Sequence, residues 1–155
     1  MSRISKDAYY LGIAEAVSKR STCLKRRYGA VIVKNDEIIS TGYNGAPRGE
    51  ENCCDKGVCL RLKKPSNSGD YSDCHSVHAE QNAIISASRK DMIGATIYLW
   101  GEESYEHKYI DRDGKPKVAV ERLWDTIKDP QPCPICQRML KNAGIDRIVV
   151  NSDED

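Results

Sequence analysis

The sequence predicts a three-layer α/β fold, in which a small mixed sheet carries helices on both faces. The chain has 155 residues, a length that suits one domain, so we expect a single domain over residues 1–155. Segments with strand patterns alternate with segments of helical periodicity, which is the pattern of layered α/β proteins. The formal net charge is only +1, which favours a folded domain over a disordered chain.

Local signals place the elements of the first half. Residues 5–19 have apolar side chains at helical spacing, and Ser5 is a suitable N-cap. Two runs at 28–34 and 37–43 are rich in strand-forming residues. The Asn-Asp pair at 35–36 lies between them and predicts a hairpin turn.

The second half predicts two helix and strand pairs. Residues 78–90 are expected to form a helix and residues 95–100 a buried strand. Residues 133–142 are expected to form a second helix, closed by Gly144 in a left-handed C-cap position. Residues 146–151 complete the predicted sheet.

Two stretches lack a clear period. Residues 44–76 are rich in Gly, Pro, Asn, Ser, charge and cysteine, and so long an irregular segment inside one domain needs an explanation. Residues 101–131 are also polar. Within them we expect a turn at 113–114 and a short helix near residues 120–127.

Charge and hydropathy exclude several classes. A net charge of +1 gives little attraction for nucleic acid, and no apolar run approaches the roughly 20 residues that span a bilayer. The N-terminus has no secretory signal, so we expect a cytoplasmic protein. Residues 1–64 hold 13 basic and 7 acidic side chains, so this half can attract a small anion. Seven cysteines in a reducing compartment indicate metal binding or chemistry.

Two short motifs carry most of the chemistry. His78 and Glu80 open one predicted helix, and Cys133 and Cys136 open another. One imidazole and two thiolates are zinc ligands, and a fourth position left for water is typical of a catalytic zinc. The positive end of a helix dipole favours thiolates in the first turn, where Pro134 is also tolerated. Glu80 lies close enough to act on zinc-bound water without being a ligand.

H-x-E combined with P-C-x-x-C is the signature of zinc nucleobase deaminases. Cys133 and Cys136 alone would be equally typical of a structural zinc knuckle, in which case the chain would be a non-catalytic binding module. A purely structural zinc needs no Glu80 and requires a fourth protein ligand, so we favour the enzyme.

The chain resembles the cytidine and deoxycytidylate deaminase family, most closely its dCMP deaminases. The matching segments are 20–23, 28–33, 42–49, 52–54, 78–84, 132–136 and 143–145. The resemblance implies the three-layer cytidine deaminase-like fold. It also implies hydrolytic deamination of dCMP to dUMP and ammonia, with Zn²⁺ activating water and Glu80 moving its proton to the ring and then to the amine. A same-fold deaminase of another base, nucleoside or modified nucleotide is the alternative.

The resemblance also implies roles around the substrate. Asn44 matches an Asn that contacts the sugar, although an Asn-Gly pair is often only a turn. Arg26 is our candidate for the phosphate, although the Lys-Arg-Arg run it belongs to is equally typical of a solvated face. Arg89 matches a regulatory Arg or is a surface helix residue. Relatives are often activated by dCTP, inhibited by dTTP and homo-oligomeric.

Five further cysteines are unused by the catalytic site. Some relatives carry a second, structural zinc, and Cys23, Cys53, Cys59 and Cys74 are the tentative ligands that the resemblance implies. Cys54 or His75 are alternatives to their neighbours, and a set of free thiols is the simpler alternative. A closed four-ligand site would explain how residues 44–76 stay ordered.

Residues 101–131 stand as an insertion relative to this family. They lie just before the second zinc-binding motif, so they are placed to cover the pocket, to alter substrate choice or to mediate oligomer contacts. A solvated surface excursion is an equally good expectation.

Overall fold

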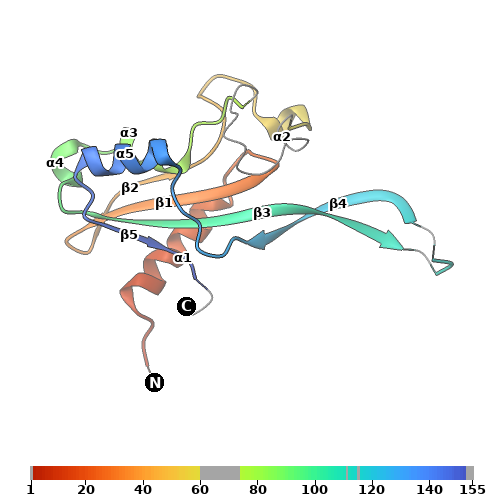
Figure 1. The fold of residues 1–155 in the computed structure, drawn as a ribbon, viewed down its shortest axis with the longest axis horizontal. Coiled ribbons are helices and arrows are strands. Elements are labelled where there is room, and N and C mark those ends of the chain that lie inside the picture. The colour runs from red at the N-terminus through yellow and green to blue at the C-terminus, as the bar shows by residue number, and fades with distance from the viewer. Residues whose placement is uncertain (1, 60–73, 111, 115, 153–155) are drawn as a thin grey trace.

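The computed structural model describes residues 2–59, 74–110, 112–114 and 116–152. Its helices are α1 Lys6–Ser18, α2 Cys53–Lys56, α3 Ala79–Ile85, α4 Arg89–Met92 and α5 Pro134–Ala143. Its strands are β1 Arg26–Lys34, β2 Glu37–Tyr43, β3 Thr96–Ile110, β4 Pro116–Thr126 and β5 Arg147–Val150. Figure 1 shows these elements along the chain.

One mixed sheet organises the structure. Strand β1 lies between β2 and β3 and is antiparallel to both. The other edge of β3 is shared by two partners, because its beginning pairs in parallel with β5 and its later part pairs antiparallel with β4. The expectation of a small mixed sheet is confirmed.

Helix α1 covers one face of the sheet. Its Tyr10, Leu11 and Ala14 are buried against Val31 of β1 and Tyr98 of β3. The hydroxyl of Ser5 accepts a hydrogen bond from the Ala8 amide at 3.1 Å, so the predicted N-cap is confirmed.

Helices α3 and α5 cover the opposite face. Ala79 and Ala83 of α3 and Leu140 of α5 are buried over Ile32 and Leu99. Figure 1 shows α3 and α5 above the strands and α1 below them, which confirms the predicted three layers.

Two glycines allow helices to approach the sheet closely. A Cβ on Gly29 would lie 2.0 Å from the Ala14 carbonyl oxygen in α1. A Cβ on Gly42 would lie 2.3 Å from the Ala79 carbonyl oxygen and 2.4 Å from the Ala83 amide nitrogen. Backbone-to-backbone contact at Gly42 therefore sets the position of α3.

Both predicted turn positions near the sheet are confirmed. Asn35 and Asp36 have φ of 54° and 61°, the left-handed values that tight hairpins need. Gly144 has φ of 90° and its amide donates to the carbonyls of Leu140 and Lys141, which ends α5.

The predicted helix at 78–90 is divided into two. Helix α3 ends at Ile85, and α4 begins only at Arg89 after Ser88. The Ser88 hydroxyl donates to the Asp91 carboxylate at 2.7 Å, a local bond that favours a new helix start.

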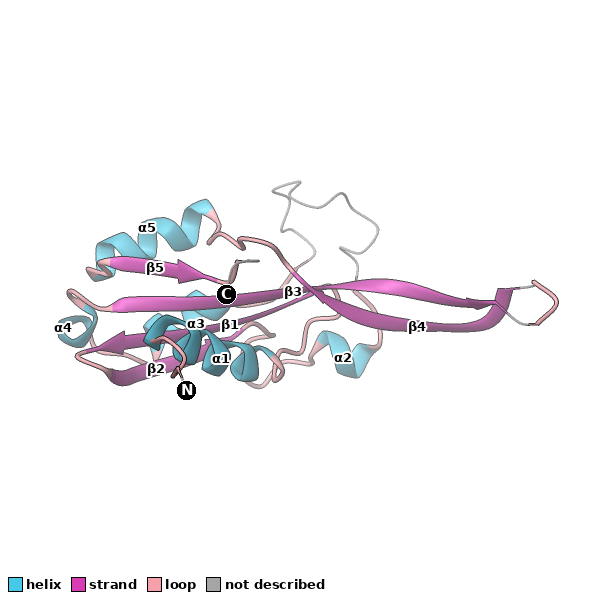
Figure 2. Cartoon of the chain, turned by 90° about the horizontal axis from the view of Figure 1, so that it is seen from below, coloured by secondary structure: helices cyan, strands magenta, loops and turns pink. Residues whose placement is uncertain are grey.

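The expectations for 95–100 and 101–131 need correction. Strand β3 does not stop at residue 100 but continues to Ile110, and the predicted short helix near 120–127 is wrong because those residues belong mostly to β4. The turn expected at 113–114 is present, and Gly114 has φ of 78°. Residues 102–110 and 116–126 thus form a two-stranded ribbon that projects from the body (Figures 1 and 2).

The segment expected to be irregular, 44–76, is described in part, because residues 60–73 lie outside the described residues. Gly45 pairs with Val77 in an isolated bridge, and the Cys54 amide donates to the Thr22 carbonyl at 3.1 Å. These bonds tie both ends of the segment to the body beside the start of β1.

No helix in the described part of the chain is long and apolar enough to cross a membrane.

Replacing Gly42 by Ala should destabilise the fold. The new methyl group would overlap backbone atoms of α3, and overpacking of this kind costs about 1–3 kcal/mol in unfolding free energy. Urea denaturation measures the change. Gly12→Ala is the control, since a Cβ on Gly12 would meet nothing within 4 Å and helical Ala should add about 0.5–1 kcal/mol. Equal effects of the two substitutions would contradict the close-contact role of Gly42.

Candidate functional site

Two helix starts meet on the same face of the sheet. His78 is the N-cap of α3, and its amide donates to the Gln81 side-chain oxygen at 2.9 Å. Cys133 is the N-cap of α5, and its sulfur accepts from the Cys136 amide at 3.4 Å. The positive ends of both helix dipoles therefore point toward this place, where they favour anionic groups.

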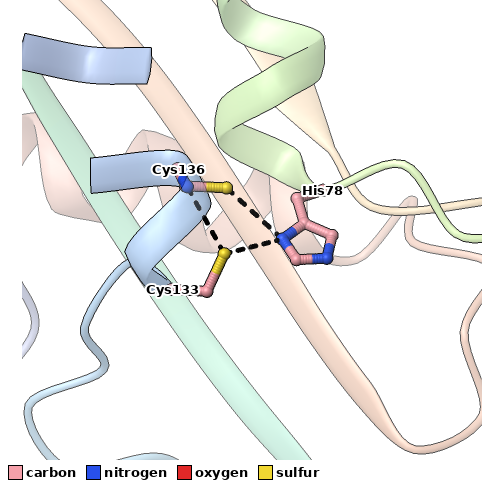
Figure 3. Close-up of side chains that lie close together, drawn as sticks. All are labelled: His78, Cys133 and Cys136. Atoms are coloured by element: carbon pink, nitrogen blue, oxygen red, sulfur yellow. Dashed lines mark hydrogen bonds between the residues drawn. The ribbon is translucent and has the colours of Figure 1, made fainter. Parts of the chain in front are cut away.

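The predicted ligand triad is brought together here, as Figure 3 shows. The His78 Nδ1 atom lies 3.5 Å from the Cys133 Sγ atom and 3.3 Å from the Cys136 Sγ atom. All three donor atoms lie within 4.8 Å of one another. In a tetrahedral zinc site, bond lengths near 2.3 Å for sulfur and 2.0 Å for nitrogen place such atoms about 3.5 Å apart. The donor set and its spacing therefore fit zinc.

The electrostatics of the triad are sensitive to a bound cation. Cys136 is fully buried. Burial, and after it the neighbouring Glu80 carboxylate, raises the pKa of the Cys136 thiol. A bound metal ion would reverse this shift, because its charge stabilises a coordinating thiolate.

Glu80 lies in the first turn of α3 and is only 4% exposed. It is close enough to Cys136 and Tyr28 to raise the pKa of both groups, in each case after the larger effect of burial. Glu80 is not one of the three grouped ligand residues. It thus has the location expected for a proton-transferring group beside a metal.

A cavity of about 620 Å³ opens over the triad. The residues that line it and belong to the predicted site are His78, Glu80, Cys133, Asn44, Arg26, Cys23, Cys59 and Cys74. Its volume is in the range of small-molecule sites. Most of the predicted site residues therefore border one space.

Asn44 fastens the edge of this cavity. Its Oδ1 atom accepts from the Tyr28 amide at 2.9 Å, and its Nδ2 atom donates to the Arg26 carbonyl at 2.9 Å. Each bond uses one of the two hydrogen-bonding positions of its atom. Asn44 directly follows β2, and Gly45 pairs with Val77 in an isolated bridge, so the Asn-Gly pair does not form a simple tight turn.

The basic run Lys25, Arg26 and Arg27 is divided by the pleat of β1. Arg26 lines the cavity and pairs with the Glu103 carboxylate through Nε at 3.3 Å and Nη2 at 3.2 Å. Arg27 points to the other face, where it pairs with buried Glu102 and stacks 4.0 Å from the ring centroid of Trp124. Lys25 lines the cavity beside Arg26.

Arg89 is not brought to the cavity. It opens α4, and its Nη2 atom donates to the Asn142 carbonyl near the end of α5. The metal-binding end of α5 is about nine residues away, or about 13 Å along a helix.

The additional cysteines gather near the triad without forming an equally compact group. Cys23, Cys59 and Cys74 line the cavity. Burial raises the pKa of the Cys23 thiol, and Cys59 and Cys74 raise it by smaller amounts. Burial also raises the pKa of Cys53, again with smaller contributions from neighbouring thiols. Among the described residues, only His78, Cys133 and Cys136 meet the 4.8 Å criterion together. Cys54 and His75 are exposed.

Tyr28 is a cavity residue to which no role was assigned from sequence. Its ring occupies the space beside Gly101, where a Cβ would lie 2.7 Å from the ring. Strand alternation could have found it, because Arg26 and Tyr28 share a face with buried Ala30 and Ile32. Lys25, Ser76 and Gln131 also line the cavity, and their local sequence carries no comparable signal.

Comparison with known proteins gives a consistent result. Residues 4–152 match the family model of the "Cytidine and deoxycytidylate deaminase zinc-binding region". A deoxycytidylate deaminase from Mycobacterium phage D29 is 36% identical over 155 residues, which covers 96% of each chain.

Solved structures share the fold. The apo dCMP deaminase of cyanophage S-TIM5 matches with a TM-score of 0.62 at 23% identity, covering 97% of this chain and 86% of that one. Its complex with dCMP and dUMP matches with a TM-score of 0.58 at 23% identity, covering 96% and 83%.

Cys136→Ser should remove about one equivalent of zinc per chain. The substitution deletes one of three protein ligands in a buried site, where a hydroxyl is a poor replacement for a thiolate. Atomic emission on purified protein measures the metal content. Glu106→Gln, at an exposed residue of the ribbon formed by β3 and β4, should leave it unchanged. Full zinc content in Cys136→Ser would exclude the triad as the metal site.

Proposed function

The chain belongs to the cytidine and deoxycytidylate deaminase family, and from this premise we propose that it converts dCMP and water to dUMP and ammonia. The observation that carries the proposal is the position of Glu80. A buried carboxylate beside a His, Cys, Cys triad, facing a cavity of about 620 Å³, is a combination that a structural zinc site does not need.

His78, Cys133 and Cys136 would hold the catalytic zinc. Bound zinc supplies Lewis acidity that activates water near neutral pH. Glu80 accepts the proton of the attacking water and delivers it to the pyrimidine ring nitrogen. The oxygen of that water adds to C4, and Glu80 then takes the remaining proton from this oxygen and passes it to the amine. The C–N bond breaks as the C4 carbonyl forms, which releases ammonia. Because Glu80 is buried, bulk water has little access to its carboxylate, which can pass protons directly between the reacting atoms.

The cavity wall offers groups for the rest of a nucleotide. The Asn44 amide has a second hydrogen-bonding position on each atom and is suited to a sugar hydroxyl. Arg26 is suited to the phosphate, and Lys25 adds a second positive charge on the same wall. Arg27 is excluded from this role, since it is committed to Glu102 and Trp124 on the other face.

We also propose that Cys23, Cys53, Cys59 and Cys74 hold a second, structural zinc. The electrostatic coupling of the four thiols supports a shared site. Cys53, Cys59 and Cys74 lie in the described parts of the 44–76 segment, and Cys23 lies just before β1. Such a metal would join Cys53 and Cys59 to Cys74 across residues 60–73, which lie outside the described residues, and so hold the segment against the body.

Other expectations stay predictions that rest on the resemblance. They are regulation by dCTP and dTTP, a role of Arg89 in it, a homo-oligomer, a cytoplasmic location, a single domain over 1–155 and the functional significance of the 101–131 insertion. A same-fold deaminase of another base remains the second candidate function, because the ribbon of β3 and β4 begins beside Arg26, where it could contact a ligand.

Glu80→Gln should lower the rate of dCMP deamination by about 10²–10⁴-fold, because the amide cannot transfer protons. Ammonia release measures the rate, and zinc content should stay at the wild-type level. Glu106→Gln, at an exposed residue on the β3–β4 ribbon, should keep its activity. Full activity in Glu80→Gln would contradict the mechanism. Faster turnover of cytosine, cytidine or another base by the wild-type protein would contradict dCMP as the substrate.

The second metal site is tested by zinc counting. The wild-type protein should contain two zinc ions per chain, and Cys23→Ser should contain one, because a four-ligand site that loses one thiolate binds zinc poorly. Parallel variants Cys53→Ser, Cys54→Ser and His75→Ala identify which neighbour is a ligand. A wild-type content of one zinc with full activity would rule out the second site.

A further inference from the structure

Three charged residues form one row across the sheet, and the row begins at Arg26, which lines the cavity. Arg26 of β1 is paired with Glu103 of β3, and Glu103 is paired in turn with Asp125 of β4. Directly opposed residues in antiparallel strands share a face, so all three belong to the cavity face of the sheet. The charges along the row are positive, negative, negative, moving from β1 toward the ribbon.

The first pair in this row is a contact between side chains. The Glu103 Oε1 atom accepts from Nε and Nη2 of Arg26. The Nη1 atom of Arg26 donates to the hydroxyl of Tyr28 at 3.4 Å, and both residues line the cavity. Glu103 and Tyr28 therefore orient the Arg26 guanidinium between them.

Stability does not account for this arrangement. The Arg26 and Glu103 side chains are 26% and 43% exposed, and ion pairs of that exposure contribute little to folding. Two carboxylates placed opposite each other, Glu103 and Asp125, are unfavourable on a sheet. An arrangement with a small benefit and a local cost indicates a role in binding.

The row also has a direction relative to the site. Along β3, Leu99 lines the cavity, and Glu103 lies four residues further toward the ribbon, which is about 13 Å of extended strand. Within the row, Arg26 is thus the residue that lines the cavity, and the two acids follow it across the sheet. A phosphate held by Arg26 meets a cation, whereas a further phosphate carried outward would approach Glu103 and Asp125.

We propose that Glu103, supported by Asp125, is a specificity-determining residue that restricts the cavity to nucleoside monophosphates and rejects diphosphates. The proposal rests on the function proposed above and adds to it the number of phosphates accepted. Removing a negative charge at this position should favour the more highly charged ligand, because it removes a like-charge repulsion. Screening confines that repulsion to short distances, so the first phosphate should be affected less than a second one nearer Glu103.

The test compares dUMP and dUDP as competitive inhibitors of dCMP deamination. The ratio of the two inhibition constants, dUDP over dUMP, should be at least about tenfold in the wild type, and Glu103→Gln should reduce it by about five- to tenfold. Asp125→Asn should shift the ratio in the same direction by a smaller factor. Glu103→Asp should restore most of the wild-type ratio.

Glu106→Gln is the matched control, since it removes one carboxylate from the same ribbon on the opposite face and pairs with Arg122 rather than Arg26. Its ratio should equal the wild-type ratio. An unchanged ratio in both Glu103→Gln and Asp125→Asn, with dCMP still deaminated, would overturn this inference alone. A wild-type protein that neither deaminates dCMP nor is inhibited by dUMP would overturn the proposed function together with it.

Discussion

Backbone contact between α3 and β2 at Gly42 is the constraint on which the site depends. The helix can lie that close only because Gly42 has no side chain, and the closeness fixes where α3 begins. His78 and Glu80 lie at that beginning, and the facing start of α5 supplies Cys133 and Cys136. Metal–ligand bond lengths tolerate only a few tenths of an ångström, so a shift of either helix would be felt at once by the triad. The packing of α3 against the sheet therefore also determines the geometry of the metal site.

The pleat of the sheet assigns adjacent charges to different tasks. Arg26 faces the cavity, while Arg27 is held by Glu102 and Trp124 on the α1 side. The same alternation places Leu99 under the cavity and Tyr98 against α1. A basic run that looks uniform in the sequence thus contains one residue suited to a ligand and one that fastens β1, β3 and β4 together.

Local patterns were sufficient for most of the fold. The capping Ser5, the turn at 35–36 and Gly144 all mark element boundaries through backbone requirements that a short window contains. The metal-binding triad could also be predicted from the sequence, because metal ligands of fixed spacing at helix starts are a local signal. The ribbon could not, since β4 is specified by pairing with β3, and a window such as 120–127 carries helical spacing that tertiary pairing overrides. The row from Arg26 to Asp125 depends on the register of three strands, which single-sequence patterns do not fix.

The change of partner along β3 has a consequence for how this protein can change in length. The cavity end of β3 is registered by β1 and β5, and only its outer part is registered by β4. The ribbon can therefore be lengthened or shortened near its tip without moving Arg26 or Glu103, provided that residues are added or lost in matched pairs. A single-residue insertion nearer the body would instead turn the following side chains to the opposite face. Changes in the length of such a ribbon should therefore be balanced between its two strands and occur near its tip, whereas the length of its base should stay constant.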